Sequence, residues 1–355
     1  MKQPGGRTLR TAVHATLIAC LLALYAPGLI AAGLDADTID DLVARAMKTF
    51  EVPGMAVGVV KEGEVVYAKG HGVRELGRDD AIDTDTLFKI ASNSKAFTAA
   101  ALAILVDEGH IEWNGAVSDY IPEFRMSEPW VTAHLSVVDL LTHRAGLVAH
   151  AGDLLLWPDP NEFTRGDVIH ALRYFPLVSP FRDSYNYDNV LYIVAGEIVP
   201  RVTGQAFEAF VDERIMRPMG MDRCFMGAIP DAEMRNLAAP HDVIDGELTV
   251  IERSRIHGEP ALYAAAGGVV CSLDDMLDWV QVQLGRGTSP EGVQLFSAAR
   301  SREMWHPEIS WNVSPRNYEW HRTHFNGYAL GWRVSDVHGY KEVSHTGSLA
   351  GMRAW

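Results

Sequence analysis

Hydrophobic residues recur with helical spacing in some stretches of the chain and with strand-like spacing in others, and these patterns predict where helices and strands lie. Near the beginning, apolar residues from Ile39 to Phe50 recur every three to four positions, which predicts an amphipathic helix over 38–50 capped by Asp37 or Thr38. The other predicted elements are a hairpin of strands 55–60 and 65–69, a buried Ala- and Leu-rich helix over 96–108, helices over 190–202 and 205–215, and strands 328–334 and 340–345. Turns are expected across Glu62-Gly63 and His338-Gly339.

Strands lie toward both ends of the chain, while residues from about 111 to 260 are mostly helical patches separated by Pro and Gly. A pattern of this kind predicts an α+β fold, in which a sheet is assembled from the two ends and a helical region is inserted between them. At 355 residues and 48% hydrophobic content, the chain can bury a substantial core.

The first residues resemble a secretory signal peptide. Lys2, Arg7 and Arg10 precede an apolar run over 11–24, and small residues follow up to position 33. We therefore expect residues 1–33 to be removed and residues 34–355 to form a secreted or periplasmic domain. An uncleaved membrane anchor and a lipid on Cys20 are the alternatives. No other segment is apolar enough to span a bilayer, so we expect no stable membrane span in the mature protein.

Charge and cysteine content narrow the functional classes. Removing the leader leaves 28 basic and 46 acidic residues, a net charge of −18, which argues against a nucleic-acid partner. The mature chain keeps only Cys224 and Cys271, which form either one bridge or two buried thiols.

Ser92 and Lys95 are the strongest candidates for chemistry. They lie three residues apart at a predicted helix start, so the hydroxyl and the amine share one face, which is the geometry of a self-activated nucleophile. Alone, this spacing is common by chance. Its companions are more specific: residues 187–189 form the only Tyr-x-Asn, and His-Thr-Gly occupies 345–347 on a predicted strand.

These motifs, with the stretches 141–147 and 264–269, resemble the serine β-lactamase-related family, which includes class C β-lactamases, DD-peptidases, D-aminopeptidases and family VIII esterases. The resemblance runs from about Ile39 to the last residue. It implies a β-lactamase/transpeptidase-like fold, with a mainly antiparallel sheet flanked by helices and an inserted helical subdomain. The active site is expected between the sheet and the subdomain.

The resemblance also implies roles for individual residues. Ser92 would be acylated, and Asn189, His345, Thr346 and Gly347 would contact the substrate. The oxyanion hole would come from the backbone amides of Ser92 and Ser348.

Residue chemistry supports the first roles independently. Lys95 can act as a base only when neutral, so the site must lower its pKa, and a phenol such as Tyr187 can pass the proton onward. Without the motifs, Tyr187 would be a packed aromatic and Asn189 a helix cap. His143 is interpreted as a hydrogen-bonding turn residue rather than a catalyst.

No metal or organic cofactor is required by this chemistry. His321 and His324 have ligand-like spacing, but no third ligand is suitably placed nearby, so we expect no metal site.

His345 departs from the β-lactamase pattern, because penicillin-recognising enzymes usually carry lysine there. A histidine is mostly neutral at pH 7 and anchors a carboxylate less well. We therefore expect a small-molecule ester, amide or peptide substrate and an esterase or D-amino-acid peptidase-like hydrolase. The alternatives are a β-lactamase and a penicillin-binding sensor that is acylated without turnover. Substrate choice is expected in the loops 150–163 and 310–324.

The last residue, Trp355, comes eight residues after Gly347. The family pattern has two further strands and a C-terminal helix after the His/Lys-Thr-Gly strand. We therefore interpret the chain as a fragment of a longer protein, whose sheet edges would be uncovered. If the chain ended there naturally, we would expect poor folding and no activity.

Overall fold

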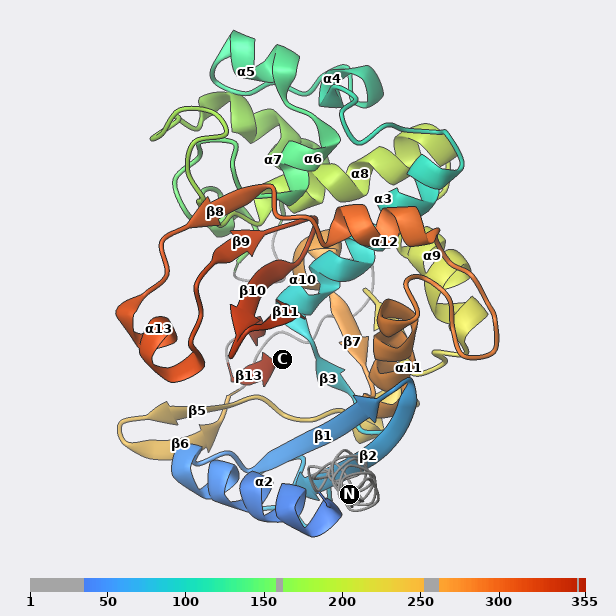
Figure 1. Ribbon diagram of the computed structural model, residues 1–355, viewed down its shortest axis with the longest axis vertical. Helices are drawn as coiled ribbons and strands as arrows, with labels where there is room; N and C mark the ends of the chain where they lie inside the picture. Colours follow the sequence, from blue (N-terminus) through green and yellow to red (C-terminus); the bar gives the residue numbers. More distant parts are fainter. Residues whose placement is uncertain (1–34, 158–161, 252–261, 350) are drawn as a thin grey trace, which may run out of the picture. The chain divides into compact units, whose positions relative to one another are not determined.

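The computed structural model describes residues 35–157, 162–251, 262–349 and 351–355 (Figure 1). The chain divides into two units, residues 1–50 and 51–355. The predicted signal peptide lies outside the described residues. Within the described residues, no helix combines the length and apolar composition needed to cross a bilayer.

The described part of the first unit is helix α2 (Ala36–Phe50). The helix confirms the predicted amphipathic segment but begins two residues earlier, and its cap was predicted wrongly. The amide of Thr38 donates to Oδ1 of Asp35 at 2.8 Å, so Asp35 caps the first turn in place of Asp37 or Thr38.

The second unit contains the remaining elements, and most of its helices are short. They are α3 (Ser94–Asp107), α4 (Val117–Tyr120), α5 (Pro129–His134), α6 (Val137–Leu141), α7 (Arg165–Ala171), α8 (Val190–Thr203), α9 (Phe207–Val211), α10 (Ala264–Gly267), α11 (Leu273–Leu284), α12 (Ala298–Met304) and α13 (Pro315–His321).

The strands of the second unit are antiparallel within each ladder and fall into separate groups. They are β1 (Gly54–Lys61), β2 (Glu64–Gly72), β3 (Phe88–Lys89), β4 (Cys224–Met226), β5 (His241–Ile244), β6 (Glu247–Val250), β7 (Val269–Cys271), β8 (Ile309–Trp311), β9 (Asn326–Tyr328), β10 (Arg333–Val337), β11 (Tyr340–Ser344), β12 (Gly347–Leu349) and β13 (Met352–Ala354). The ladders are β1-β2, β3-β7-β4, β5-β6, β11-β10-β9-β8 and β12-β13.

The expected single sheet, built from both ends of the chain, is therefore not formed among the described residues. Strand β1 pairs with β2, and strand β13 pairs with β12. Neither β1 nor β13 therefore joins the ladder of β8, β9, β10 and β11. The α+β composition is as predicted, and the middle of the chain is mostly helical, although β4, β5 and β6 also lie there.

Both predicted hairpin turns are confirmed. Glu62 and Gly63 have φ values of 55° and 87°, and His338 and Gly339 have values of 51° and 85°. Two successive positive φ values define the tight turn that matches the twist of antiparallel strands.

The core centres on α3, which is apolar all round and buried along most of its length. Phe97 of α3 stacks on Trp279 of α11 with ring centroids 4.2 Å apart. Helices α8 and α10 also pack against α3, and Figure 1 shows α3 running from the end of β3 toward α8. Lys95, in the first turn of α3, is therefore held within this buried core, and Ser92 lies in the turn directly before the helix.

Two predicted boundaries were wrong for identifiable reasons. The helix expected over 205–215 begins only at Phe207, because Ala206 is non-helical with a ψ of 142°, and it continues from Asp212 as a π-helical turn to Met216. The strand expected over 328–334 is broken at Gly331, where an added Cβ would lie 2.7 Å from the carbonyl oxygen of Lys95. The chain turns there to pass close to α3.

Candidate active site

Ser92 lies in a 3₁₀ turn, η1 (Ala91–Asn93), directly before α3. Ala91 has a φ of 49°, an uncommon value for a residue other than glycine. Ser94 holds this turn, because its Oγ donates to the carbonyl of Ala91 at 2.6 Å and accepts from the amide of Val269 at 2.9 Å. The amide of Ile90 also donates to the carbonyl of Val269 at 3.1 Å. Strand β7 thus fixes a turn that leaves Ser92 partly exposed.

Lys95 is fully buried, and its Nζ has three polar neighbours. Nζ lies 3.2 Å from Oγ of Ser92, 2.8 Å from Oδ1 of Asn189 and 2.7 Å from the carbonyl oxygen of Ala266. Two of these partners can only accept hydrogen bonds. A neutral amine has two N–H groups and one lone pair, so the Asn189 and Ala266 oxygens take both N–H groups. In the neutral amine the lone pair is then left to accept from the hydroxyl of Ser92, whereas the protonated amine donates to Oγ.

Burial also favours the neutral amine. Desolvation lowers the pKa of Lys95 to about 7, against the opposing charges of Asp188 and Asp153. The amine can therefore lose its proton near neutral pH, as a general base for Ser92 requires.

Tyr187 completes the contacts of Ser92. Its hydroxyl donates to Oγ of Ser92 at 2.7 Å, and burial raises the pKa of the phenol above its usual value, which keeps it protonated. His143 holds both neighbours of Tyr187: its carbonyl accepts from the amide of Asn186 at 2.8 Å, and its Nδ1 accepts from the amide of Asp188 at 3.1 Å. The interpretation of His143 as a buried hydrogen-bonding turn residue agrees with these contacts and with its φ of 57°.

Asn189 is not a side-chain helix cap. It lies at the start of α8, but the side chain makes no capping hydrogen bond. Its Oδ1 faces Lys95, and its Nδ2 donates to Oδ1 of Asp153 at 3.0 Å. Asp188 caps the helix instead, accepting from the amide of Leu191 at 3.1 Å.

Strand β12 lies against the turn that carries Ser92. A Cβ added to Gly347 would come within 1.9 Å of the carbonyl oxygen of Ile90 and 3.2 Å of Cβ of Ala91. Thr346 and Ser348, on either side of the buried Gly347, are exposed. The structure therefore brings the His-Thr-Gly segment beside Ser92, and the roles of these residues toward a substrate stay predictions.

His345 was expected on a strand but lies between β11 and β12. Its Nδ1 is 2.8 Å from the carbonyl oxygen of Thr346, which can only accept, so Nδ1 carries the proton and Nε2 accepts from the Tyr328 hydroxyl at 2.8 Å. Burial and the nearby Lys95 lower the pKa of His345 well below its ordinary value, so the ring is neutral.

Three neighbours of the site were not predicted as site residues. Ala266 lies in the stretch 264–269, but a sequence does not indicate which backbone carbonyl reaches a site. Asp153 lies in the loop expected to govern substrate choice. Arg333 pairs in register with Tyr328 on one side and Ser344 on the other, so its side chain projects from the face that carries Tyr328. It is exposed, and no ion pair to it is found among the described residues.

The histidine pair with ligand-like spacing has other partners. Nδ1 of His324 lies 2.9 Å from Oδ2 of Asp336, and the carbonyl of His321 accepts from the amide of His338 at 2.7 Å. Over the described ranges, no group of three or more His, Cys, Asp or Glu residues is arranged to hold a metal ion.

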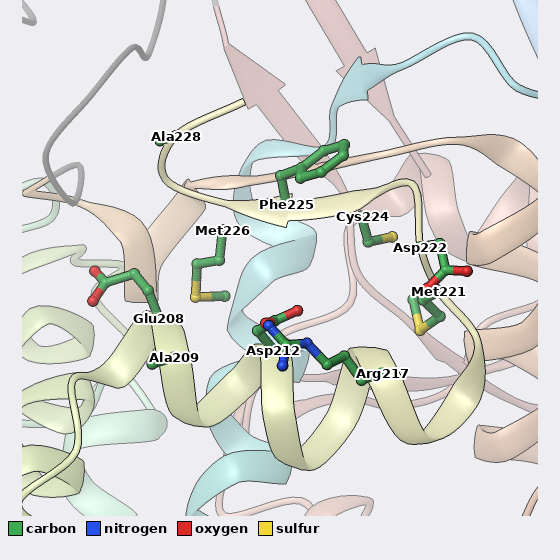
Figure 2. Close-up of a pocket in the computed structure, with 10 residues that line it drawn as sticks. All are labelled: Glu208, Ala209, Asp212, Arg217, Met221, Asp222, Cys224, Phe225, Met226 and Ala228. Carbon is green, nitrogen blue, oxygen red and sulfur yellow. The ribbon is translucent and has the colours of Figure 1, made fainter. Parts of the chain in front are cut away.

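A pocket of about 430 Å³ lies between strand β4 and the segment from α9 through the π-helical turn (Figure 2). It is lined by Glu208, Ala209, Asp212, Arg217, Met221, Asp222, Cys224, Phe225, Met226 and Ala228. None of the predicted site residues lines it.

Cys224, at one side of this pocket, is bonded to Cys271, so the two thiols form the bridge that the sequence left open.

A mixed helix and antiparallel-strand fold with Ser92, Lys95 and Tyr187 in mutual contact defines the β-lactamase/transpeptidase-like class of proteins. The chain belongs to the Beta-lactamase family, whose family model matches residues 39–355.

Two relatives are similar to the chain over most of its length. The chain is 29% identical over 325 residues to "Unguisins hydrolase ungD'" of Aspergillus campestris, covering 88% of this chain and 57% of that protein. It is 25% identical over 318 residues to "Protein flp" of Staphylococcus aureus, covering 88% of this chain and 58% of that protein. The chain thus spans a little over half the length of these relatives.

The fold also resembles that of an octameric penicillin-binding protein homologue from Pyrococcus abyssi. The TM-score is 0.73 at 24% sequence identity, over 88% of this chain and 68% of the other. At this identity, the likeness shows the fold alone.

Proposed function

We propose that the protein is an exported serine hydrolase that forms an acyl-enzyme on Ser92, with esterase or D-amino-acid peptidase-like activity. The observation that carries the proposal is the position of Lys95. Its two acceptor-only partners direct the amine lone pair at Ser92, and the hydroxyl of Tyr187 contacts the same oxygen from a second element. The relative named as a hydrolase supports the reaction class.

The geometry supports a defined course for acylation. Oγ of Ser92 forms a bond to the substrate carbonyl carbon as its proton passes to Nζ of Lys95. Negative charge on the carbonyl oxygen is stabilised by the amides of Ser92 and Ser348. When the bond to the leaving group breaks, Tyr187 gives its proton to that group and regains one from Lys95. Water then attacks the acyl carbon, Lys95 with Tyr187 takes up the proton that the water loses, and that proton passes to Oγ of Ser92 as the bond between Oγ and the acyl carbon breaks.

The state of His345 favours the esterase and peptidase branches over a β-lactamase. His345 is neutral and both of its ring nitrogens have internal partners, so it supplies no cation for a substrate carboxylate. Arg333 is an exposed cation beside the same residues, in register with Tyr328. A guanidinium there is suited to a substrate carboxylate of either a peptide or a β-lactam, so it does not separate these two classes.

Export is supported by two observations. The basic residues and apolar run before position 34 are typical of a signal peptide. The bond between Cys224 and Cys271 is of the kind that persists in oxidising compartments.

The test compares the purified protein with Ser92→Ala on p-nitrophenyl esters, D-amino-acid peptides and a chromogenic cephalosporin. We expect wild-type turnover of an ester or peptide, and a loss of at least about 1,000-fold in Ser92→Ala with an unchanged circular dichroism spectrum. Retained activity in the variant would exclude Ser92 as the nucleophile. One equivalent of covalent adduct without further turnover would favour the sensor, and rapid cephalosporin hydrolysis would favour the β-lactamase.

A further inference from the structure

Asp153 begins the 3₁₀ turn Asp153–Leu155 and stands beside the site, although no motif marks it. Its Oδ1 accepts from Nδ2 of Asn189 at 3.0 Å, and its Oδ2 lies 3.0 Å from Nδ1 of His150. The side chain of Asp153 is 24% exposed and that of His150 is 63% exposed. A line of polar contacts therefore runs from an exposed imidazole, through Asp153 and Asn189, to the buried Lys95.

The chemistry of these groups fixes the direction of the Asn189 amide. A carboxylate can only accept hydrogen bonds, so Asp153 must face the NH₂ end of the amide. The oxygen end is then directed at Lys95, whose N–H groups need an acceptor there. A reversed amide would set NH₂ against the lysine N–H groups and oxygen against the carboxylate, which is repulsive at both ends.

We propose that Asp153 is a positioning residue for Lys95, which holds the Asn189 amide in one orientation and places a negative charge behind it. This inference rests on the proposed function, since it assigns Asp153 to the proton transfer between Ser92 and Lys95.

Other charged and titratable groups also surround Lys95. Asp188 opposes the effect of burial on the pKa of Lys95 more strongly than Asp153 does. His143 and His345 face Lys95 from other elements and are neutral, because burial and the lysine charge lower the pKa of both.

The rings of Tyr187 and Tyr192 lie 4.9 Å and 5.0 Å from Nζ of Lys95. Of the two carboxylates, Asp188 is fully enclosed and caps α8, whereas the Asp153 side chain is 24% exposed. Asp153 can therefore be changed without leaving a cavity in the core.

Two variants separate orientation from charge. Asp153→Asn keeps an acceptor oxygen for Asn189 but removes the negative charge, and Asp153→Ala removes both. The matched control is Asp183→Asn, which removes one exposed negative charge from a nearby loop, where the carboxylate bonds the hydroxyl of Ser184. The readout is the pH profile of kcat/KM for a p-nitrophenyl ester.

For Asp153→Asn, we expect the acid-side midpoint to move down by about 0.5 to 1 pH unit, because the protonated amine loses a favourable charge. The plateau should stay within about threefold of wild type. For Asp153→Ala, we expect a similar shift and a plateau about tenfold lower, since the Asn189 amide is no longer held. Asp183→Asn should reproduce the wild-type profile.

The proposal is overturned if the Asp153→Asn profile coincides with that of Asp183→Asn. It is also overturned if Asp153→Asn raises KM only for substrates that carry an amino group, with the midpoint unchanged, because Asp153 would then contact the substrate. Ser92→Ala, measured in parallel, keeps the two proposals separate. If Ser92→Ala is inactive and the Asp153 variants match wild type, only this inference fails, whereas an active Ser92→Ala refutes the proposed function itself.

Discussion

The hydroxyl of Tyr187 lies 2.7 Å from Oγ of Ser92, and it donates the hydrogen bond. The two residues are 95 positions apart in the sequence, and they belong to segments held by different partners. Strand β7 and Ser94 fix the turn that carries Ser92, whereas His143 holds both backbone neighbours of Tyr187. Two separate sets of hydrogen bonds, one around Ser92 and one around Tyr187, thus position this contact.

Tyr187→Phe should lower kcat for a p-nitrophenyl ester by about 100- to 10,000-fold, the usual range for removing a general acid or base. The ring would still pack on His143, whose centroid is 4.3 Å away, so the fold should remain. The matched control is Tyr120→Phe, which removes a hydroxyl whose partner is the amide of Glu112, at 3.0 Å, instead of Ser92. Equal losses in the two variants would contradict a specific role for Tyr187.

The pH dependence of acylation should report the deprotonation of Lys95. Its pKa is lowered to about 7 by burial, and only the neutral amine can accept the serine proton. We therefore expect kcat/KM to be half-maximal near pH 7 and to fall about tenfold per pH unit below it. Burial raises the pKa of Asp188 to about 7 as well. The midpoint of the pH profile therefore describes the joint titration of Lys95 and Asp188.

Lys95→Arg provides the check on this assignment, because a guanidinium stays charged at every accessible pH. The variant should be inactive from pH 5 to 9 in stopped-flow acylation assays. A wild-type rate that is constant between pH 5 and 8 would show that no group with a pKa near 7 acts as the base.

Much of the site was predictable because it depends on local spacing. Ser92 and Lys95 meet since both lie at one helix start, and Tyr187 and Asn189 are two residues apart. The fold class and the hairpin turns were predictable for the same reason, since turn residues and helical periods are local signals.

The rest depends on contacts between distant segments. The carbonyl of Ala266 and the carboxylate of Asp153 reach the site only through packing of α10 and the loop before α7, and a backbone carbonyl leaves no mark in a sequence. The strand break at Gly331 was missed because it is set by the closeness of the Lys95 carbonyl rather than by its neighbours in the chain.

The bond between Cys224 and Cys271 should contribute to stability, because it closes a loop across a separation of 47 residues. Replacing both cysteines by alanine should lower the free energy of unfolding by about 2 to 4 kcal/mol, measured by guanidinium denaturation. Wild-type protein unfolded with a reductant present should match the variant, and the variant itself should not respond to reductant. Identical midpoints for oxidised wild type and variant would show that the bridge is not formed.

Gly347→Ala should impair acylation more than stability. The added Cβ would lie 1.9 Å from the carbonyl oxygen of Ile90, a backbone atom that cannot move without shifting the turn that carries Ser92. A displacement of about 1 Å between reacting groups can cost about 100-fold in rate, and we expect a loss of kcat/KM of that size. Gly166→Ala is the matched control, because its Cβ would meet only Oγ1 of Thr164 at 3.5 Å. Full activity in Gly347→Ala would mean that β12 does not support the site, whereas a loss in both variants would point to general destabilisation.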